Sequence, residues 1–185
     1  MFKLNTIFRT YLVAALVAIT PIVPALGQSV SKEAAVKAAF VFNFIKFVEW
    51  PDKVFSGSET PIKLCVWGRS ALDGALNALR NKTAKNRGIR VLYTQEEREA
   101  SRCHILFIAR TGHARLETVI SQTTGKNVLT VSDIPDFARS GGTIGLFQSE
   151  HRMRFAINVD AARRSGLRIS SQLLKLGKIV SSEEQ

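Results

Sequence analysis

Cysteine and histidine are the residue types of this chain best suited to covalent or metal chemistry, and the chain has two cysteines and three histidines. Cys103 and His104 are adjacent, which suggests a thiol–imidazole pair, but neighbouring residues of a strand point to opposite faces of a sheet. The two residues therefore cannot act together as nucleophile and base. His104, His113 and His151 also lack metal-ligand spacing with the cysteines, so we predict no metal site.

Other motifs of catalysis are equally weak. The glycine-rich segment 141–145 suggests a phosphate loop, but it precedes a strand-like segment and lacks both the Lys-Ser/Thr pair and the G-x-G-x-x-G order. A turn that leads into a hairpin explains it better. Asp133 or Asp136 more plausibly serves a turn around Pro135 than acts as a general acid, and no serine lies in a G-x-S-x-G elbow. We predict no catalytic residue and no cofactor, and expect that the protein is not an enzyme.

The two cysteines can instead form a disulfide. In an exported protein, Cys65 and Cys103 would be oxidised, because that compartment favours disulfides. The bond would close a loop of about 39 residues, which is worth roughly 4 kcal/mol in the chain-entropy model. The alternative is two buried free thiols that act as small hydrophobic side chains, since both lie in apolar, strand-like segments.

Residues 1–27 have the pattern of a removable export signal. Lys3 and Arg9 precede an apolar segment at about residues 11–23, and small residues precede Gln28. An uncleaved anchor helix is the alternative, but the apolar segment is shorter than the roughly 20 residues that span a bilayer. We predict cleavage before Gln28, one exported domain of residues 28–185, and no membrane span after cleavage.

The mature chain would be strongly basic. Cleavage removes Lys3 and Arg9, which lowers the formal net charge from +11 to +9. This balance fits nucleic acid, anionic lipid, acidic polysaccharide or an acidic protein surface as a partner. Nucleic acid is disfavoured for an exported protein, and the basic residues are scattered, so most of them are best explained as a solvated surface.

The segment 40–51 holds five of the chain's 11 Phe and 2 Trp residues. Apolar side chains recur here with the period of one helix face: Val36, Phe40, Phe44, Phe47 and Val48. We predict a helix over residues 31–49 that ends at Trp50-Pro51, because proline disfavours helical geometry in the residue before it. Its aromatic face is expected to pack in the core, although one or two rings could contact a partner.

Strand and helix patterns alternate through the rest of the chain. Predicted strands cover residues 62–67, 89–94, 103–109 and 127–131, a predicted hairpin pairs 143–148 with 152–158, and predicted helices cover 70–80, 95–102, 111–123, 160–165 and 170–180. Alternation of this kind indicates parallel strands with helical crossovers. We predict a single-domain α/β fold: a three-layer sandwich whose sheet is mostly parallel, with a C-terminal antiparallel hairpin, flanked by helices.

Three long segments resemble the YfiR-like family of periplasmic proteins. They are residues 37–51, with Asn43-Phe44 and Trp50-Pro51; residues 103–108; and residues 141–174, with Asn158 and Asp160. Together the match spans about residues 32–180. The resemblance implies an α/β sandwich in the periplasm that binds the periplasmic sensing domain of an inner-membrane diguanylate cyclase. Such binding would repress cyclic di-GMP synthesis and restrain biofilm formation, and members of the family can form homodimers.

The resemblance also implies roles for particular residues. Cys65 and Cys103 match family cysteines that respond to oxidation, which favours the disulfide and allows redox control of binding. The family's partner-binding surface lies around the second arm of the hairpin, which points to Phe155, Ala156 and Asn158. For Phe155, packing in the core is as good an interpretation as contact with a partner. Relatives often carry an acid at the position of Ala156, so a contact between charges is not expected there.

Two other functional classes fit the sequence. A small-ligand sensor would use the crevice at the carboxyl ends of the parallel strands, lined by Gly68, Ala109-Arg110 and Ser132-Asp133. A ligand-induced thermal shift would distinguish this class from a protein that binds only a partner. An envelope enzyme of unknown class is the third interpretation, for which turnover would be the distinguishing observation.

Overall fold

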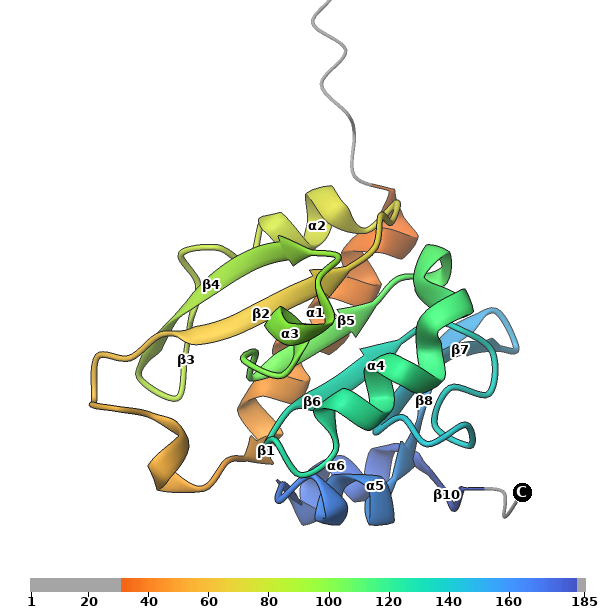
Figure 1. Cartoon of the computed structure of the whole chain (residues 1–185). Coiled ribbons are helices and arrows are strands. Elements are labelled where there is room, and N and C mark those ends of the chain that lie inside the picture. The colour runs from red at the N-terminus through yellow and green to blue at the C-terminus, as the bar shows by residue number, and fades with distance from the viewer. Residues whose placement is uncertain (1–30, 183–185) are drawn as a thin grey trace, which may run out of the picture.

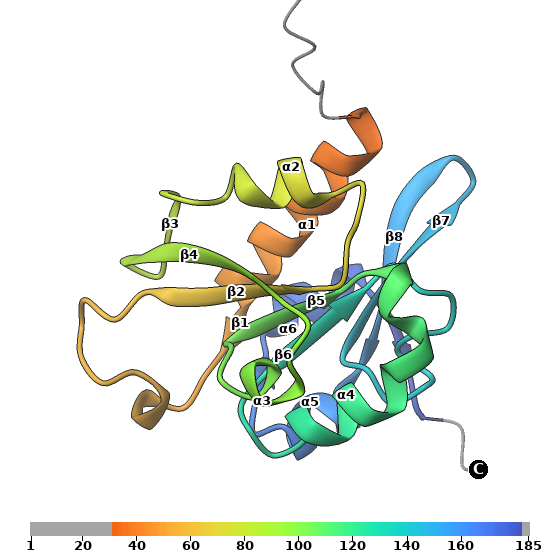
Figure 2. The ribbon, with the colours of Figure 1, turned by 45° about the horizontal axis from the view of Figure 1, so that its top comes forward.

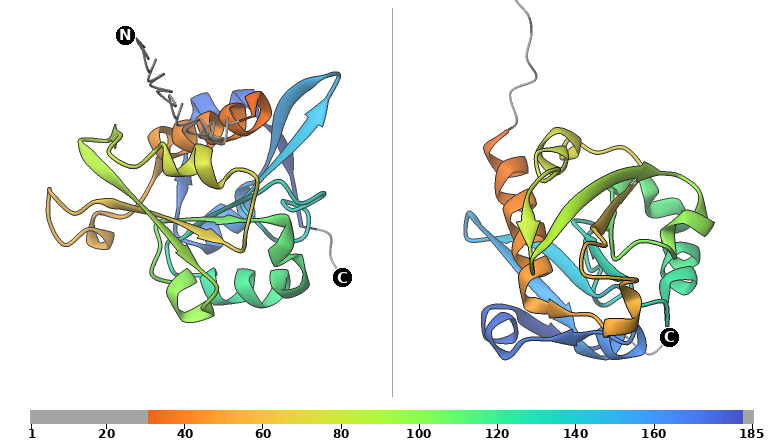
Figure 3. Two further views of the ribbon diagram at one scale, coloured as in Figure 1. Left: turned by 90° about the horizontal axis from the view of Figure 1, so that it is seen from above. Right: turned by 90° about the vertical axis from the view of Figure 1, so that its left-hand side faces the viewer.

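An eight-stranded sheet separates two layers of helices in the computed structural model of the protein, which describes residues 31–182 (Figures 1 and 3). The predicted signal peptide therefore lies outside the described residues. The strands of the sheet are β2 (Ile62–Trp67), β3 (Thr83–Ala84), β4 (Arg87–Thr94), β5 (Ile105–Ile108), β6 (Leu129–Ser132), β7 (Ile144–Ser149), β8 (Arg152–Asn158) and β10 (Lys178–Val180). They lie in the order β10-β8-β7-β6-β5-β2-β4-β3.

The central strands β4, β2, β5, β6 and β7 are parallel to one another. Strand β8 returns antiparallel to β7, and β10 pairs parallel to β8 at the edge of the sheet. The predicted fold class is therefore confirmed: a mostly parallel α/β sandwich with an antiparallel hairpin. Among residues 31–182, no helix combines the length and the apolar character that crossing a membrane requires.

The helices cover the sheet on both faces. They are α1 (Lys32–Phe47), α2 (Asp73–Asn77), α3 (Glu97–Ala100), α4 (Leu116–Thr123), α5 (Val159–Arg164) and α6 (Ser171–Leu176), with short 3-10 turns η1 (Asp52–Val54) and η2 (Arg110–Arg115). Helices α1 and α2 lie on one face and α3 and α4 on the other, while α5 and α6 lie together at one end (Figure 1). Several helices are shorter than the sequence pattern predicts; α2, for example, spans five residues instead of 70–80.

Strand β2 shows why two helical layers form. Its side chains alternate, as strand geometry requires. Ile62, Leu64 and Val66 join the larger hydrophobic core beneath α1 and α2, whereas Cys65 and Trp67 join a smaller core beneath α3 and α4. Both faces of the central strands are thus buried, which explains their nearly continuous apolar sequence.

Helix α1 begins at a serine cap and ends two residues earlier than predicted. The Ser31 hydroxyl accepts a hydrogen bond from the Ala34 amide, at 3.1 Å, and so satisfies a free donor of the first turn. The helix ends at Phe47 because Val48 and Glu49 form strand β1 (Val48–Glu49), which pairs antiparallel with β9 (Arg168–Ile169). The prediction of helix over residues 48–49 was wrong, since these residues pair with partners 121 and 119 positions away in the sequence.

The predicted C-terminal helix over residues 170–180 is also wrong in its second half. The chain is helical only in α6, turns extended at Gly177, and continues as β10 beside β8. A Cβ atom on Gly177 would lie 2.7 Å from the Phe155 ring and 2.8 Å from the Ile157 side chain. Because residue 177 has no side chain, the chain can approach the β8 side chains closely and continue as β10, which a longer helix would prevent.

Candidate functional site

The hairpin of β7 and β8 extends beyond the neighbouring strands (Figure 2). Its two arms pair in register, with Leu146 opposite Phe155 and Gly145 opposite Ala156. The turn consists of Glu150 and His151, and both have positive φ, at 49° and 59°. Two-residue turns with positive φ match the twist of antiparallel strands. The sequence prediction of the hairpin is confirmed.

The three predicted partner-binding residues of β8 have different environments. Phe155 is buried and packs its ring against Phe44 and Phe40, with centroid distances of 5.1 and 5.6 Å. Asn158 is fully buried: its Nδ2 donates to the Ala138 carbonyl at 2.8 Å. Its Oδ1 accepts from the Ala161 amide, which caps helix α5. Of the three, Ala156 is the residue with partial exposure, so it is the one placed to touch another molecule directly.

A groove of about 240 Å³ lies beside Ala156. The loop of residues 134–139, residues 145–147 of β7, and Lys178 and Val180 of β10 form its other walls. Phe147 lies at this groove with 37 % of its surface exposed, and Ile179 of the adjoining edge strand is 53 % exposed. Sequence reasoning missed the contribution of β10, because it assigned these residues to a helix.

A second hollow lies at the carboxyl ends of the parallel strands. From β2 the chain adds β4 on one side of the sheet and then β5 and β6 on the other, so the crossovers leave in opposite directions between β2 and β5. Parallel α/β sheets bind ligands at such a switch point. Of the residues predicted there, Arg110 and Asp133 line one cavity of about 230 Å³. Gly68 lines a neighbouring cavity of about 350 Å³. Ser132 does not reach either cavity, because it is buried and its hydroxyl donates to the Ile108 carbonyl at 2.6 Å.

Asp133 forms a buried ion pair that the sequence pattern did not reveal. Its Oδ2 lies 2.6 Å from the Lys37 Nζ, and both side chains are buried. Lys37 also contacts Glu33 one helical turn away, at 2.8 Å, and Arg110 Nε lies 3.6 Å from Asp133. The assignment of Asp133 to a turn around Pro135 was therefore incomplete. Lys37 lies on the aromatic helix, 96 residues from its partner, and no local spacing indicates this contact.

The pKa values of this cluster follow its geometry. Burial alone would lower the pKa of the Lys37 ammonium, but the hydrogen bonds that it donates to Asp133 and Glu33, together with the charges of these carboxylates, outweigh burial and raise it above its ordinary value. The hydrogen bond and charge of Lys37 lower the pKa of Glu33. The lysine is thus held in its charged form at neutral pH, and it ties α1 to the carboxyl end of β6.

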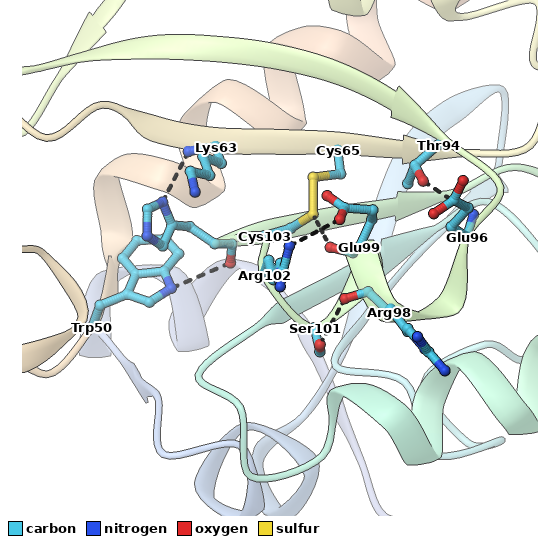
Figure 4. Close-up of a disulfide and its surroundings, with 11 residues drawn as sticks. Trp50, Lys63, Cys65, Thr94, Glu96, Arg98, Glu99, Ser101, Arg102 and Cys103 are labelled. Carbon is cyan, nitrogen blue, oxygen red and sulfur yellow. Dashed lines mark hydrogen bonds and ion pairs between the residues drawn. A yellow bond between two sulfur atoms is a disulfide. The ribbon is translucent and has the colours of Figure 1, made fainter.

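Cys65 and Cys103 form the disulfide that we predicted (Figure 4). The bond joins β2 to the segment just before β5, and its Cα atoms are 5.9 Å apart. Both residues are buried in the smaller core, with 1 % and 4 % of their surfaces exposed. A buried disulfide between neighbouring strands favours a structural role. Across residues 31–182, no three Cys, His, Asp or Glu side chains are placed to hold a metal ion.

His104 lies beside this disulfide in sequence but takes part in a separate buried contact. Its Nδ1 accepts a hydrogen bond from the Lys63 amide at 2.9 Å, and its carbonyl accepts from the Trp50 indole at 3.3 Å. Its ring packs on Phe55 with a centroid distance of 4.7 Å. Burial, followed by the nearby charge of Lys63, lowers the pKa of His104 to about 4. The imidazole is therefore neutral at pH 7 and acts as an acceptor.

This environment predicts a loss of stability in acid. Because the native pKa lies below the unfolded value of 6.5, the unfolded chain binds more protons between these values. The stabilisation from neutral His104 is complete above pH 6.5 and is lost as the pH falls toward 4, by about 3 kcal/mol. We expect His104→Asn, which keeps an acceptor but cannot titrate, to remove this part of the pH dependence in urea unfolding curves.

The exposed His151 supplies the control for this experiment, since His151→Asn makes the same substitution at a histidine that is not buried. We expect the pH profile of that variant to match the wild type. Parallel profiles of the wild type and His104→Asn from pH 7 to pH 4 would contradict the assigned cause. Carboxylates also titrate between pH 7 and pH 4, so the effect of His104 is measured as the difference between the wild-type and His104→Asn profiles.

Comparison with known protein families agrees with the sequence motifs and with the fold. The model of one family, described as YfiR/HmsC-like, matches residues 34–178. This match includes the aromatic helix, the parallel sheet, both cysteines and the hairpin, and it covers more than half of the chain. The chain therefore belongs to the YfiR/HmsC-like family.

Proposed function

We propose that this protein binds the periplasmic sensor domain of an inner-membrane diguanylate cyclase and represses it. The proposal is supported by membership of a family of periplasmic regulators in cyclic di-GMP signalling. The observation that carries it is the groove beside Ala156, where an exposed aromatic ring and an edge strand meet. In this proposal the matured chain acts in the periplasm, where repression lowers cyclic di-GMP and limits biofilm formation.

Repression of this kind needs no catalytic residue in the repressor. A protein that binds one conformation of the cyclase sensor more tightly shifts the population toward that conformation. Moving such an equilibrium tenfold requires a difference in binding free energy of about 1.4 kcal/mol between the two states. Phe147 can supply part of this difference, since fully burying an exposed Phe side chain contributes roughly 1.5–3 kcal/mol and 37 % of the Phe147 surface is still exposed.

Redox control of partner binding would act over a distance of several strands. The disulfide joins β2 to the segment before β5, while the groove lies beside β7, β8 and β10. Strand β6 separates β5 from β7. We therefore propose that oxidation affects partner binding through the stability of the domain, because neither cysteine lines the groove.

An affinity pull-down from detergent-solubilised envelopes tests the partner proposal. The baits are residues 28–185 of the wild type, Phe147→Ser and Ala156→Arg. We expect the wild type to recover a diguanylate cyclase, and each groove variant to recover it at least tenfold less, since each removes apolar contact or places a charge in the groove. Mass spectrometry identifies the cyclase, and cellular cyclic di-GMP should rise in strains that carry either variant.

Tyr93→Ser provides a matched control, because it removes another exposed aromatic ring from β4, near the opposite edge of the sheet. Its recovery of the cyclase should equal that of the wild type. Equal recovery by all four baits would place the interaction outside the groove. Failure of the wild type to recover any cyclase would contradict the proposed function itself.

A further inference from the structure

The two loops at the carboxyl ends of β2 and β5 are fixed to each other. The Thr111 hydroxyl accepts a hydrogen bond from the Arg69 amide at 3.0 Å and donates one to the Arg69 carbonyl at 2.9 Å. Gly68 turns the chain with a φ of +84°, and a Cβ atom there would lie 2.7 Å from the Thr111 hydroxyl. The backbone at this switch point is therefore held in one arrangement before any ligand arrives.

The same loops present cationic side chains whose charges are poorly neutralised. Within residues 31–182, the guanidinium of Arg69 makes no hydrogen bond or ion pair, although the residue is exposed beside both cavities. Arg110 and Arg115 are exposed and reach carboxylates only at 3.6 and 3.9 Å. With Lys37, the two cavities are lined by four cationic side chains against two carboxylates, Glu33 and Asp133. When Glu97, which pairs with Arg115 from outside the lining, is counted as well, the cluster keeps a net charge of +1.

The size of the hollow suits a small molecule. Arg69 borders the cavity of about 230 Å³ on one side and the cavity of about 350 Å³ on the other. The first cavity is smaller than the roughly 300–1,000 Å³ that small-molecule sites occupy, and the second falls near the lower end of that range, so a ligand of ordinary size would extend over both. A ligand that extends across Arg69 would reach Arg110 in the first cavity and Arg115 in the second.

We propose that this crevice binds a small organic dianion that carries carboxylate or phosphate groups. Arg69 and Arg110 bind the anionic groups, because a guanidinium donates two parallel hydrogen bonds to a carboxylate or a phosphate. Lys37 remains paired with Asp133 and Glu33 and does not contact the ligand directly. The dianion site is separate from the groove beside Ala156 and does not depend on the proposed cyclase partner.

Isothermal titration with succinate and with inorganic phosphate, at constant ionic strength, tests this site. The proteins are the wild type, the crevice variant Arg69→Gln/Arg110→Gln and the control Arg90→Gln/Arg154→Gln, which removes two exposed charges from β4 and β8. We expect saturable binding of at least one anion to the wild type. Binding should weaken at least tenfold in the crevice variant, since a lost charged hydrogen bond has about that effect, and less than twofold in the control.

The two probes distinguish the sources of the anion. Binding of succinate alone supports a dicarboxylate ligand, and binding of phosphate alone supports a phosphate ester. The proposal is overturned if neither anion saturates the wild type by about 10 mM, which corresponds to a binding free energy weaker than about −3 kcal/mol. It is also overturned if the control loses affinity as strongly as the crevice variant, because binding would then be general attraction to a basic protein.

Discussion

Replacing both cysteines with alanine is expected to lower the free energy of unfolding by about 4 kcal/mol. Cys65 and Cys103 are 38 residues apart in sequence, so their bond removes much of the freedom of the unfolded chain. The native state should change little, since the His104 amide already donates to the Lys63 carbonyl at 3.0 Å and holds the same strands together. The loss is a large share of a typical domain stability of about 5–15 kcal/mol.

Urea unfolding of the oxidised wild type, the reduced wild type and Cys65→Ala/Cys103→Ala measures this effect. We expect the last two proteins to have similar midpoints, well below that of the oxidised protein. The denaturant slope should also rise when the bond is absent, because a chain without the crosslink exposes more surface on unfolding. A loss of less than about 1 kcal/mol in both would show that the bond does not act on the unfolded chain as the entropy model requires.

Features that depend on local pattern were predictable from the sequence. The nearly continuous apolar segment of β5 indicated a strand buried on both faces, and the alternating side chains of β8 indicated a hairpin arm. The disulfide was predicted from two cysteines in a chain whose first residues have the pattern of an export signal, and the family resemblance favoured it over two free thiols. In each case a short segment, or the composition of the whole chain, carries the physical constraint.

Features that depend on distant contacts were not predictable. Strand β10 exists because residues 178–180 pair with β8, and the residues themselves continue the apolar pattern of α6 without a visible break except Gly177. Asn158 lies at the end of a strand, where the resemblance suggested a surface role. Its carboxamide instead caps α5 and bonds to Ala138, which only the packed structure reveals.

In the candidate sites, too, local pattern was predictable and distant contacts were not. Sequence reasoning placed Arg110 and Asp133 at a shared edge, because the carboxyl ends of parallel strands meet there. It could not place Lys37 in the same cluster, since that residue comes from a helix whose aromatic side chains dominate the pattern. The groove beside Ala156 likewise depends on β10, so its full outline needed the sheet order.

Replacing Lys37 with methionine is expected to lower the free energy of unfolding by about 3 kcal/mol, at the lower end of the range for a broken buried ion pair. The change leaves the Asp133 carboxylate, in a residue that is 8 % exposed, with only Arg110 at 3.6 Å. Methionine preserves most of the apolar stem, so lost packing adds little. Because the pKa of Lys37 is raised, its charge is constant at pH 7 and below, and unfolding can be measured at pH 7 without titrating it.

The double variant Lys37→Met/Asp133→Asn separates an uncompensated charge from a loss of shape. If the carboxylate causes the cost, neutralising it should restore at least about 1 kcal/mol relative to Lys37→Met, because the penalty for a buried unpaired charge disappears. The surface pair of Arg168 and Glu49, at 3.0 Å, serves as the control, and Arg168→Met should cost less than about 1 kcal/mol. A double variant no more stable than Lys37→Met would mean that the uncompensated carboxylate is not the cause of the loss, and that α1 is held to β6 mainly by packing.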